Sequence, residues 1–163
     1  MNTLGRSIFT VVLLASFAMW FGGFCFYVSI VVPIATDVLG SSFDQGLITR
    51  RVTQVLNWFG LCAGAMMLVH SCFGLKSGRS KATVVQLVSV VLMLIMQLVL
   101  FWLHPQIDAY VDVEIRDIAG DYDQFYFLHR LYLWASTVQW FASWLWLICF
   151  VVENGKTSGM SQP

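Results

Sequence analysis

The stretch TVVQLVSVVLMLIMQLVLFWL, residues 83–103, contains no charged residue and decides the class of fold. An α-helix rises about 1.5 Å per residue, so about 20 apolar residues are enough to cross the hydrocarbon core of a bilayer. We therefore predict a transmembrane helix from Thr83 to Leu103. Its few polar side chains, such as Gln86 and Gln97, should face protein, because lipid offers no hydrogen-bond partner.

Three other apolar segments have the length of a membrane span, namely residues 8–35, 52–73 and 127–152. Only 11% of the 163 residues are charged, against roughly 25% in soluble domains. Arg6 ahead of the first segment resembles the start of a signal peptide, but the apolar run continues to Val32, which favours an uncleaved span. We expect an all-α integral membrane protein, a single membrane domain over residues 1–163 that forms an antiparallel up-and-down bundle of four transmembrane helices.

The charges of the loops predict the orientation of this bundle. Residues 74–82 carry three basic residues and no acidic one, whereas residues 105–124 carry six acidic residues and one arginine. By the positive-inside rule the basic loop lies in the cytoplasm. We therefore expect a multi-pass protein of the plasma or inner membrane with both termini cytoplasmic. The acidic loop outside is expected to hold a short helix or a hairpin.

Small and polar residues recur along each predicted span at spacings of three and four, which places them on one helix face. Transmembrane helices associate through small residues and shared hydrogen bonds, so these faces are predicted to line the interior. In chain order the four faces comprise Ala15, Ala18, Gly22, Cys25 and Ser29; Thr53, Asn57, Gly60, Gly64, Met67 and Ser71; Gln86, Met93, Gln97 and His104; and His129, Tyr132, Ser136, Gln139 and Ser143. Ser42 and Gln45 have the spacing of a capping box, which predicts that the second helix begins near Phe43.

Polar and ionisable residues gather near the outer side of the predicted bundle. The candidate ligand-binding residues are Arg50, Arg51, Asn57, His104, His129 and Gln139. Charged groups are costly within a membrane, so such a cluster is a functional hypothesis. Arginine would supply charge-assisted bonds, and histidine titrates near neutral pH. A lipid headgroup, a quinone or a small organic substrate would suit this site.

Two other interpretations of the same cluster stay open. In the structural one, the arginines extend to the surface and pair with Asp37 or the acidic loop, while His129 bonds a neighbouring helix. In the other, His104 and His129 lie at equal height and hold a metal or a haem, whose bis-histidine ligation needs two facing imidazoles. We predict no metal and no cofactor, with haem on these two histidines as a lesser alternative.

No nucleophile elbow, P-loop, HExxH motif or paired intramembrane carboxylate is present, so we expect no catalytic residue and no enzyme. With zero net charge and no basic run, the chain gives no indication of nucleic-acid binding. We expect a non-catalytic bundle or accessory subunit in the lipid bilayer, partnered by a second copy or by another membrane protein. The alternatives are a binding or transport protein with an outward-facing polar site and, third, a redox subunit with haem or metal.

Three motifs resemble those of the transmembrane protein 205-like family: FGGFCFYVSIVVP at residues 21–33, RRVTQVLNWFG at 50–60 and LHRLYLWAS at 128–136. The resemblance covers about residues 8–152. It implies a four-helix membrane fold and a domain without an established biochemical activity. In that family an asparagine commonly follows the fourth-span histidine by about seven residues, where this chain has Ser136. Copper-resistance-type and anthrone-oxygenase-like membrane proteins share the glycine-then-proline first span and remain alternatives.

Overall fold

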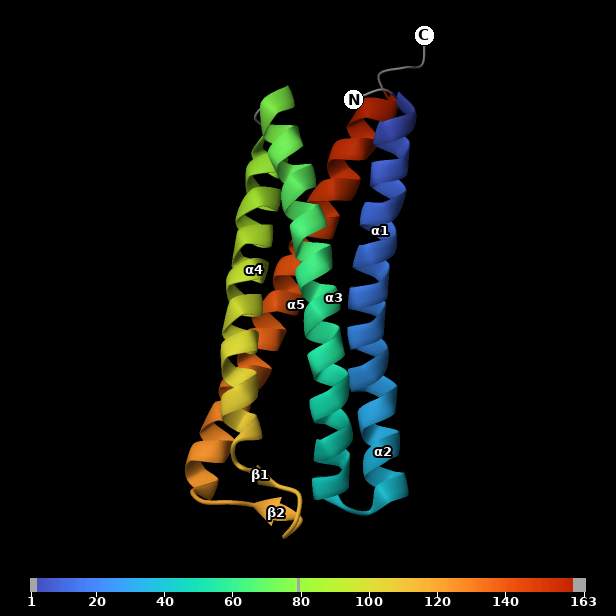
Figure 1. The fold of residues 1–163 in the computed structure, drawn as a ribbon. Helices are drawn as coiled ribbons and strands as arrows, with labels where there is room; N and C mark the ends of the chain where they lie inside the picture. Colours follow the sequence, from blue (N-terminus) through green and yellow to red (C-terminus); the bar gives the residue numbers. More distant parts are fainter. Residues whose placement is uncertain (1–2, 79, 160–163) are drawn as a thin grey trace.

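A computed structural model of the chain describes residues 3–78 and 80–159. Figure 1 shows long helical segments that alternate in direction, with the start of the first (blue) and the end of the last (red) at one end of the bundle. Within the described residues, four helical segments are long and apolar enough to cross a membrane. This confirms the expected all-α integral membrane protein. We call the end with Thr3 and Gly78 the terminal end, and the end with Gly40 and residues 109–121 the hairpin end.

The first segment consists of α1 (Thr3–Phe26), the π-helical turn η1 (Tyr27–Val31) and α2 (Val32–Leu39). The first span was expected over residues 8–35, and its helical segment continues through Pro33 to Leu39. A proline lacks an N–H and its ring clashes with the carbonyl four residues earlier, here that of Ser29, which lies in the wider turn of η1. The segment ends at Gly40, whose left-handed φ of 58° lets its N–H bond the Thr36 carbonyl.

Helix α3 (Ser42–Ser77) begins one residue earlier than the capping-box spacing predicted. Ser41, not Ser42, is the N-cap, and its hydroxyl oxygen accepts the N–H of Asp44 at 3.3 Å. The reason is local: Ser41 has the extended backbone that an N-cap needs, whereas Ser42 is already helical.

Helix α4 (Lys81–Asp108) is capped by Ser80 and continues through Pro105, where a loop was expected. Asp108 therefore lies in the last helical turn. Strands β1 (Val111–Asp112) and β2 (Asp117–Ile118) form an antiparallel hairpin, which is one of the two predicted forms of the acidic loop. Helix α5 (Tyr122–Gly159) then returns to the terminal end.

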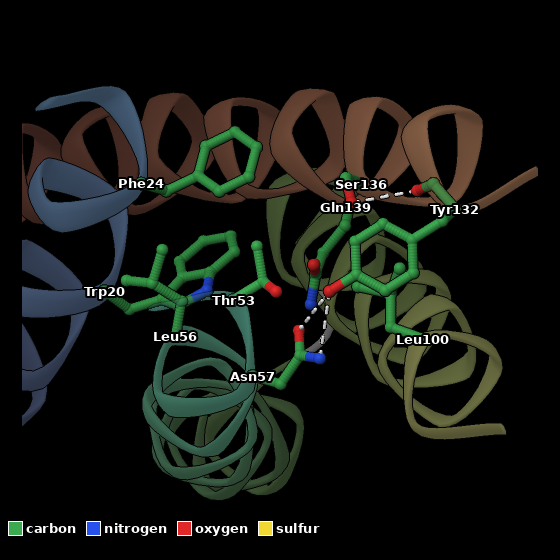
Figure 2. Close-up of a pocket in the computed structure, with 9 residues that line it drawn as sticks. All are labelled: Trp20, Phe24, Thr53, Leu56, Asn57, Leu100, Tyr132, Ser136 and Gln139. Carbon is green, nitrogen blue, oxygen red and sulfur yellow. Dashed lines mark hydrogen bonds between the residues drawn. The ribbon is translucent and has the colours of Figure 1, made fainter. Parts of the chain in front are cut away.

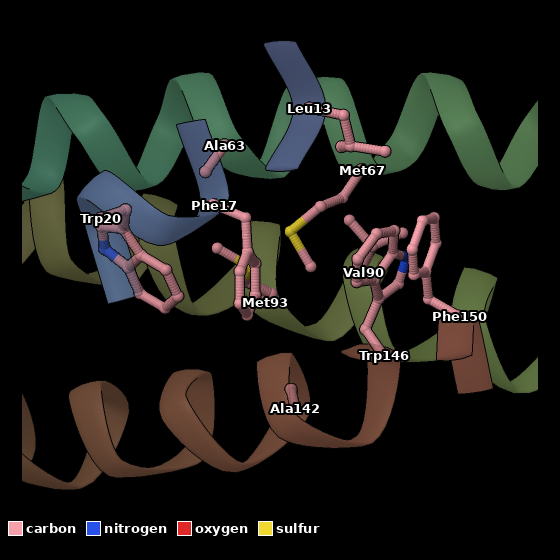
Figure 3. Close-up of a cluster of buried hydrophobic side chains, with 10 residues drawn as sticks. All are labelled: Leu13, Phe17, Trp20, Ala63, Met67, Val90, Met93, Ala142, Trp146 and Phe150. Carbon is pink, nitrogen blue, oxygen red and sulfur yellow. The ribbon is translucent and has the colours of Figure 1, made fainter. Parts of the chain in front are cut away.

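The buried core draws side chains from all four helical segments (Figure 3). Helix α4 packs between α3 and α5, and α3 packs against α1. Aromatic rings join α1 to α5, with Phe17 and Trp146 at 6.0 Å and Phe21 and Trp140 at 5.9 Å between centroids. The buried hydrophobic cluster comprises Leu13, Phe17, Trp20, Ala63, Met67, Val90, Met93, Ala142, Trp146 and Phe150.

The predicted inner face of the first span is wrong for four of its five members; the fifth, Cys25, is half-buried, and its Sγ accepts the Nε1–H of Trp140 at 3.3 Å. Ala15, Ala18, Gly22 and Ser29 are exposed, and the buried face of the segment carries Leu13, Phe17, Trp20 and Tyr27. Large rings bridge the gap between α1 and α5, which small side chains would leave open. In contrast, Asn57, Gly60, Gly64, Met67 and Ser71 of α3 are all buried as predicted.

Gly60 shows why α3 needs a glycine at this contact. A Cβ atom at residue 60 would lie 2.4 Å from Gln97 Oε1 and 2.7 Å from Trp20 Nε1. At Gly64 it would lie 2.7 Å from Leu94 Cδ2. The GxxxG pair therefore lets α3 approach both α4 and α1 closely.

Candidate functional site

A charged cluster lies between α3 and α4 at the hairpin end. Arg50 Nε lies 2.8 Å from Asp108 Oδ1, and His104 Nε2 lies 3.8 Å from Asp108 Oδ2. The second distance is too long for a hydrogen bond. His104 Nε2 is buried and has no hydrogen-bond partner among the described residues. Arg50 thus pairs with Asp108 of the predicted acidic segment 105–124, which is one of the two expected pairings, and not with Asp37.

Asn57 and Tyr132 connect α3 to α5 just inside this cluster. Asn57 Nδ2 donates to Tyr132 Oη at 3.0 Å, and the Tyr132 hydroxyl donates to Asn57 Oδ1 at 3.3 Å. Asn57 is only 5% exposed. The Tyr132 ring lies 6.4 Å from the His104 ring, so this pair adjoins the charged cluster.

Asn57 and Tyr132 also line an internal cavity of about 20 Å³, shown in Figure 2. Such a volume holds about one water molecule. Pockets for small organic ligands are usually about 300–1,000 Å³. The lining residues are Trp20, Phe24, Thr53, Leu56, Asn57, Leu100, Tyr132, Ser136 and Gln139. This cavity therefore does not accommodate a quinone or a substrate of similar size.

Gln139 bonds a neighbouring helix. Its Nε2 donates to Gln97 Oε1 at 2.7 Å, and both side chains are almost fully buried. Gln97 Nε2 has no hydrogen-bond partner in the described part of the chain. The pair links α4 to α5 near the Gly60 contact.

The structure does not gather the remaining candidates into the same site. Arg51 is exposed and makes no ion pair within residues 3–78 and 80–159. His129 is partly buried and stacks on Phe125 of its own helix, with centroids 6.1 Å apart. His104 contacts Asp108 and Tyr132 instead, so the described ring contacts do not join the two histidines. The same residues contain no group of three or more His, Cys, Asp or Glu side chains that could hold a metal ion.

Sequence reasoning missed a polar cluster at the terminal end. The Glu153 carboxylate of α5 accepts the Thr83 hydroxyl at 2.6 Å, the Gln86 amide at 2.9 Å and the Ser80 hydroxyl. These three donors lie in the first turns of α4 or cap it. The spacing of three and four that ends at Ser143 continues through Trp146 and Phe150 to Glu153, so an extended reading of that face would have found it.

An ion pair between the hairpin and α3 was also missed. Arg116 Nη2 lies 2.7 and 2.6 Å from the two carboxylate oxygens of Asp44, which joins the hairpin to the start of α3. Next to it, Asp117 accepts the Tyr122 hydroxyl and the N–H of Ile118, both at 2.8 Å. The Tyr122 hydroxyl, with the Ile118 N–H, holds the pKa of Asp117 below its ordinary value.

The comparisons with known proteins give a family but no characterised relative. The model of one protein family, described as a domain of unknown function (DUF4149), matches residues 15–113. No curated protein and no solved structure matches the chain. The matched segment is more than half of the 163 residues and extends from α1 through β1. The chain therefore belongs to the family of the domain of unknown function DUF4149.

Proposed function

We propose that the protein acts without catalysis, as a small membrane bundle that serves as an accessory subunit of a membrane complex. The carrying observation is that the polar faces of α3, α4 and α5 bond to one another. Asn57 bonds Tyr132, Gln97 bonds Gln139, and Glu153 bonds the start of α4. The cavity between them has only about 20 Å³. These groups hold helices together and leave the outer surface of the bundle for partners.

The proposal extends to the finer family and the orientation. The motifs at residues 21–33, 50–60 and 128–136 support a place among the transmembrane protein 205-like proteins. Lys76 and Lys81 lie at the terminal end, while the acidic residues of the loop lie at the hairpin end. The charge asymmetry supports cytoplasmic termini and an outward hairpin in a plasma or inner membrane.

The assembly state tests the accessory role. Membranes that contain the tagged chain would be extracted with digitonin and separated by native electrophoresis, next to purified monomer in the same detergent. We expect a discrete species larger than the monomer, with a stoichiometric second membrane protein identified by mass spectrometry. A chain that migrates only as a monomer, or only as copies of itself, would contradict the accessory role.

Cysteine labelling tests the orientation. Ser77→Cys and Ala119→Cys would be introduced singly into a chain whose four native cysteines are replaced by serine or alanine. We expect a membrane-impermeant maleimide to label residue 119 in intact cells and residue 77 only after lysis. Labelling of residue 77 from outside would reverse the topology.

One observation favours a second candidate function, a polar ligand site at the hairpin end. The buried His104 Nε2 has no hydrogen-bond partner in the described part of the chain and lies beside the Arg50–Asp108 pair. An anion is the simplest ligand to test here, because a guanidinium gives an anion charge-assisted hydrogen bonds. Titration with inorganic phosphate should shift the ¹⁵N resonances of the His104 ring. Unchanged resonances at millimolar phosphate would remove this candidate.

We also propose that the protein carries no haem. The His104 ring contacts Tyr132 and the His129 ring stacks on Phe125, so the described ring contacts do not join the two histidines that would have to face each other. The protein purified in mild detergent should show no Soret absorbance. A Soret band that disappears in His104→Ala would contradict this.

A further inference from the structure

A second hollow lies on the outside of the bundle at the hairpin end. It is an open groove of about 310 Å³, and its lining presents no polar surface. Phe26, Ile30, Ile34 and Val38 form one side along α1, η1 and α2, and Ile48 of α3 forms part of the other. All of these segments belong to helices long enough to cross a membrane. The groove therefore opens to lipid.

The length of the first segment places this groove near the headgroups. Leu4–Leu39 has 36 residues, about 54 Å of helix, whereas the hydrocarbon core is about 30 Å thick. The segment must extend beyond the hydrocarbon, and the groove occupies its last part, residues 26–39, at the hairpin end. A molecule in the groove would thus have one part among acyl chains and another at the level of the headgroups.

Arg51 supplies an uncompensated positive charge beside the groove. It is exposed and makes no ion pair within the described residues, whereas its neighbour Arg50 pairs with Asp108. Arg51 follows Ile48 by three residues, so both lie on one face of α3. Side chains of a helix lean toward its N-terminus, which directs Arg51 back over Ile48 and toward the hairpin end.

Asp37 supplies the opposite charge on the other side. It lies on α2 between the groove residues Ile34 and Val38, is exposed, and makes no ion pair among the described residues. The groove is therefore flanked by one free guanidinium and one free carboxylate. This pattern complements a headgroup that contains both a phosphate and an amine, and it disfavours a headgroup that is only anionic.

We infer that the groove binds a phospholipid with a primary ammonium headgroup, of the phosphatidylethanolamine type. An acyl chain occupies the apolar groove, Arg51 donates to the phosphate, and Asp37 accepts from the ammonium group. Guanidinium binds phosphate through two charge-assisted hydrogen bonds, which a smaller ammonium does not reproduce. This binding is independent of the accessory role, because it uses the lipid-facing side of the first segment and needs no partner protein.

Native mass spectrometry of the full chain in detergent tests the phosphate contact. Titration with phosphatidylethanolamine should give a one-to-one complex, and Arg51→Gln should weaken it by roughly tenfold. Arg130→Gln is the matched control, since Arg130 is also an exposed arginine near the hairpin end but lies on α5. We expect the control to bind like the wild type. Equal affinity of the Arg51→Gln and wild-type chains would overturn the inference.

A second pair of variants tests the groove itself. Ala35 is the smallest residue of its lining, so Ala35→Phe should fill part of the hollow and reduce lipid binding as much as Arg51→Gln does. Ala18→Phe adds the same ring to an exposed position of α1 outside the groove and should leave binding unchanged. Thermal unfolding would verify that both variants are folded. Full binding by a folded Ala35→Phe chain would contradict the acyl-chain position.

The headgroup is tested by changing the lipid. We expect phosphatidylethanolamine to bind more tightly than phosphatidylcholine, whose quaternary ammonium donates no hydrogen bond, and more tightly than phosphatidylglycerol. Asp37→Asn should remove the preference for the ethanolamine headgroup. Tighter binding of phosphatidylglycerol by the wild-type chain would overturn the assignment of Asp37.

Discussion

Gln139 of α5 donates a hydrogen bond to Gln97 of α4 at 2.7 Å, in a region where both side chains are almost completely buried. Such bonds within membranes contribute about 0.6 kcal/mol on average and up to about 1.7 kcal/mol. The two side chains stay bonded because each amide group, if separated, would lie among apolar side chains without a hydrogen-bond partner. Its contribution can be measured directly by substituting one or both partners.

Gln139→Leu should destabilise the bundle by about 1–2 kcal/mol. The substitution leaves Gln97 Oε1 without its hydrogen-bond donor, in addition to Gln97 Nε2, which has no partner among the described residues. The double variant Gln97→Leu/Gln139→Leu should be more stable than the sum of the single variants predicts. Unfolding by sodium dodecyl sulfate in mixed micelles would give the four free energies. Gln124→Leu, at an exposed position, is the control. Strictly additive effects would show that the two amides do not interact.

Gly60→Ala should lower the free energy of unfolding by about 1–3 kcal/mol, because the new methyl group would meet Gln97 and Trp20 in a closely packed contact. Gly22→Ala is the matched control: a Cβ atom there has no neighbour within 4 Å. Since alanine is the better helix former, this control should be neutral or slightly stabilising. The same micelle assay distinguishes the two. An equal loss in both variants would contradict the packing explanation, because helix propensity alone would stabilise both.

Glu153→Leu should destabilise the terminal end of the bundle, because Ser80, Thr83 and Gln86 lose a shared acceptor. We expect a loss of about 1–3 kcal/mol. Amide hydrogen exchange should accelerate most in the first turns of α4. Glu114→Leu changes an exposed carboxylate of the hairpin and serves as the control. Unchanged exchange in α4 would show that Glu153 does not hold these helices together.

The hairpin should respond to pH through Asp117. Its pKa lies below the ordinary value of 3.8 because the ionised carboxylate accepts hydrogen bonds from Tyr122 and Ile118. The charged form therefore stabilises the hairpin above pH 3.8, and this contribution is lost as the pH falls below that value through the lowered pKa. The amide resonance of Ile118 should report this titration, and Asp117→Asn should abolish it. Titration of that resonance above pH 3.8 would contradict the assignment.

The sequence predicted the inner faces of α3, α4 and α5 because glycines and amides recur there at helical spacing. It failed for α1, whose exposed small residues and buried aromatic residues both follow that spacing. The sequence of α1 alone does not indicate the distance to the neighbouring helix that its side chains must span. Only the position of α5, with Trp140 and Trp146 facing α1, makes the aromatic face the inner one.

The charged cluster was predicted in position and in one of its two alternative pairings. Arg50, Asn57, His104 and Gln139 do lie in or next to the polar interior, and the partner of Arg50 is Asp108 of the predicted acidic segment 105–124, not Asp37. What the sequence did not predict is that Asp108 is helical. Pro105 suggested the end of a helix, whereas α4 continues for one further turn and places the Asp108 carboxylate beside His104.

The aromatic inner face of α1 has a consequence for biosynthesis. The span that contains α1 leaves the ribosome before α3, α4 and α5, and it must reside in the bilayer until they follow. Phe17, Trp20 and Leu13 tolerate contact with lipid during that interval, because they bring few hydrogen-bonding groups. The amides of Gln97 and Gln139 arrive later, on α4 and α5, which follow one another along the chain and bond one another. The span that waits longest for its partner α5 thus carries apolar side chains on the face that will be buried.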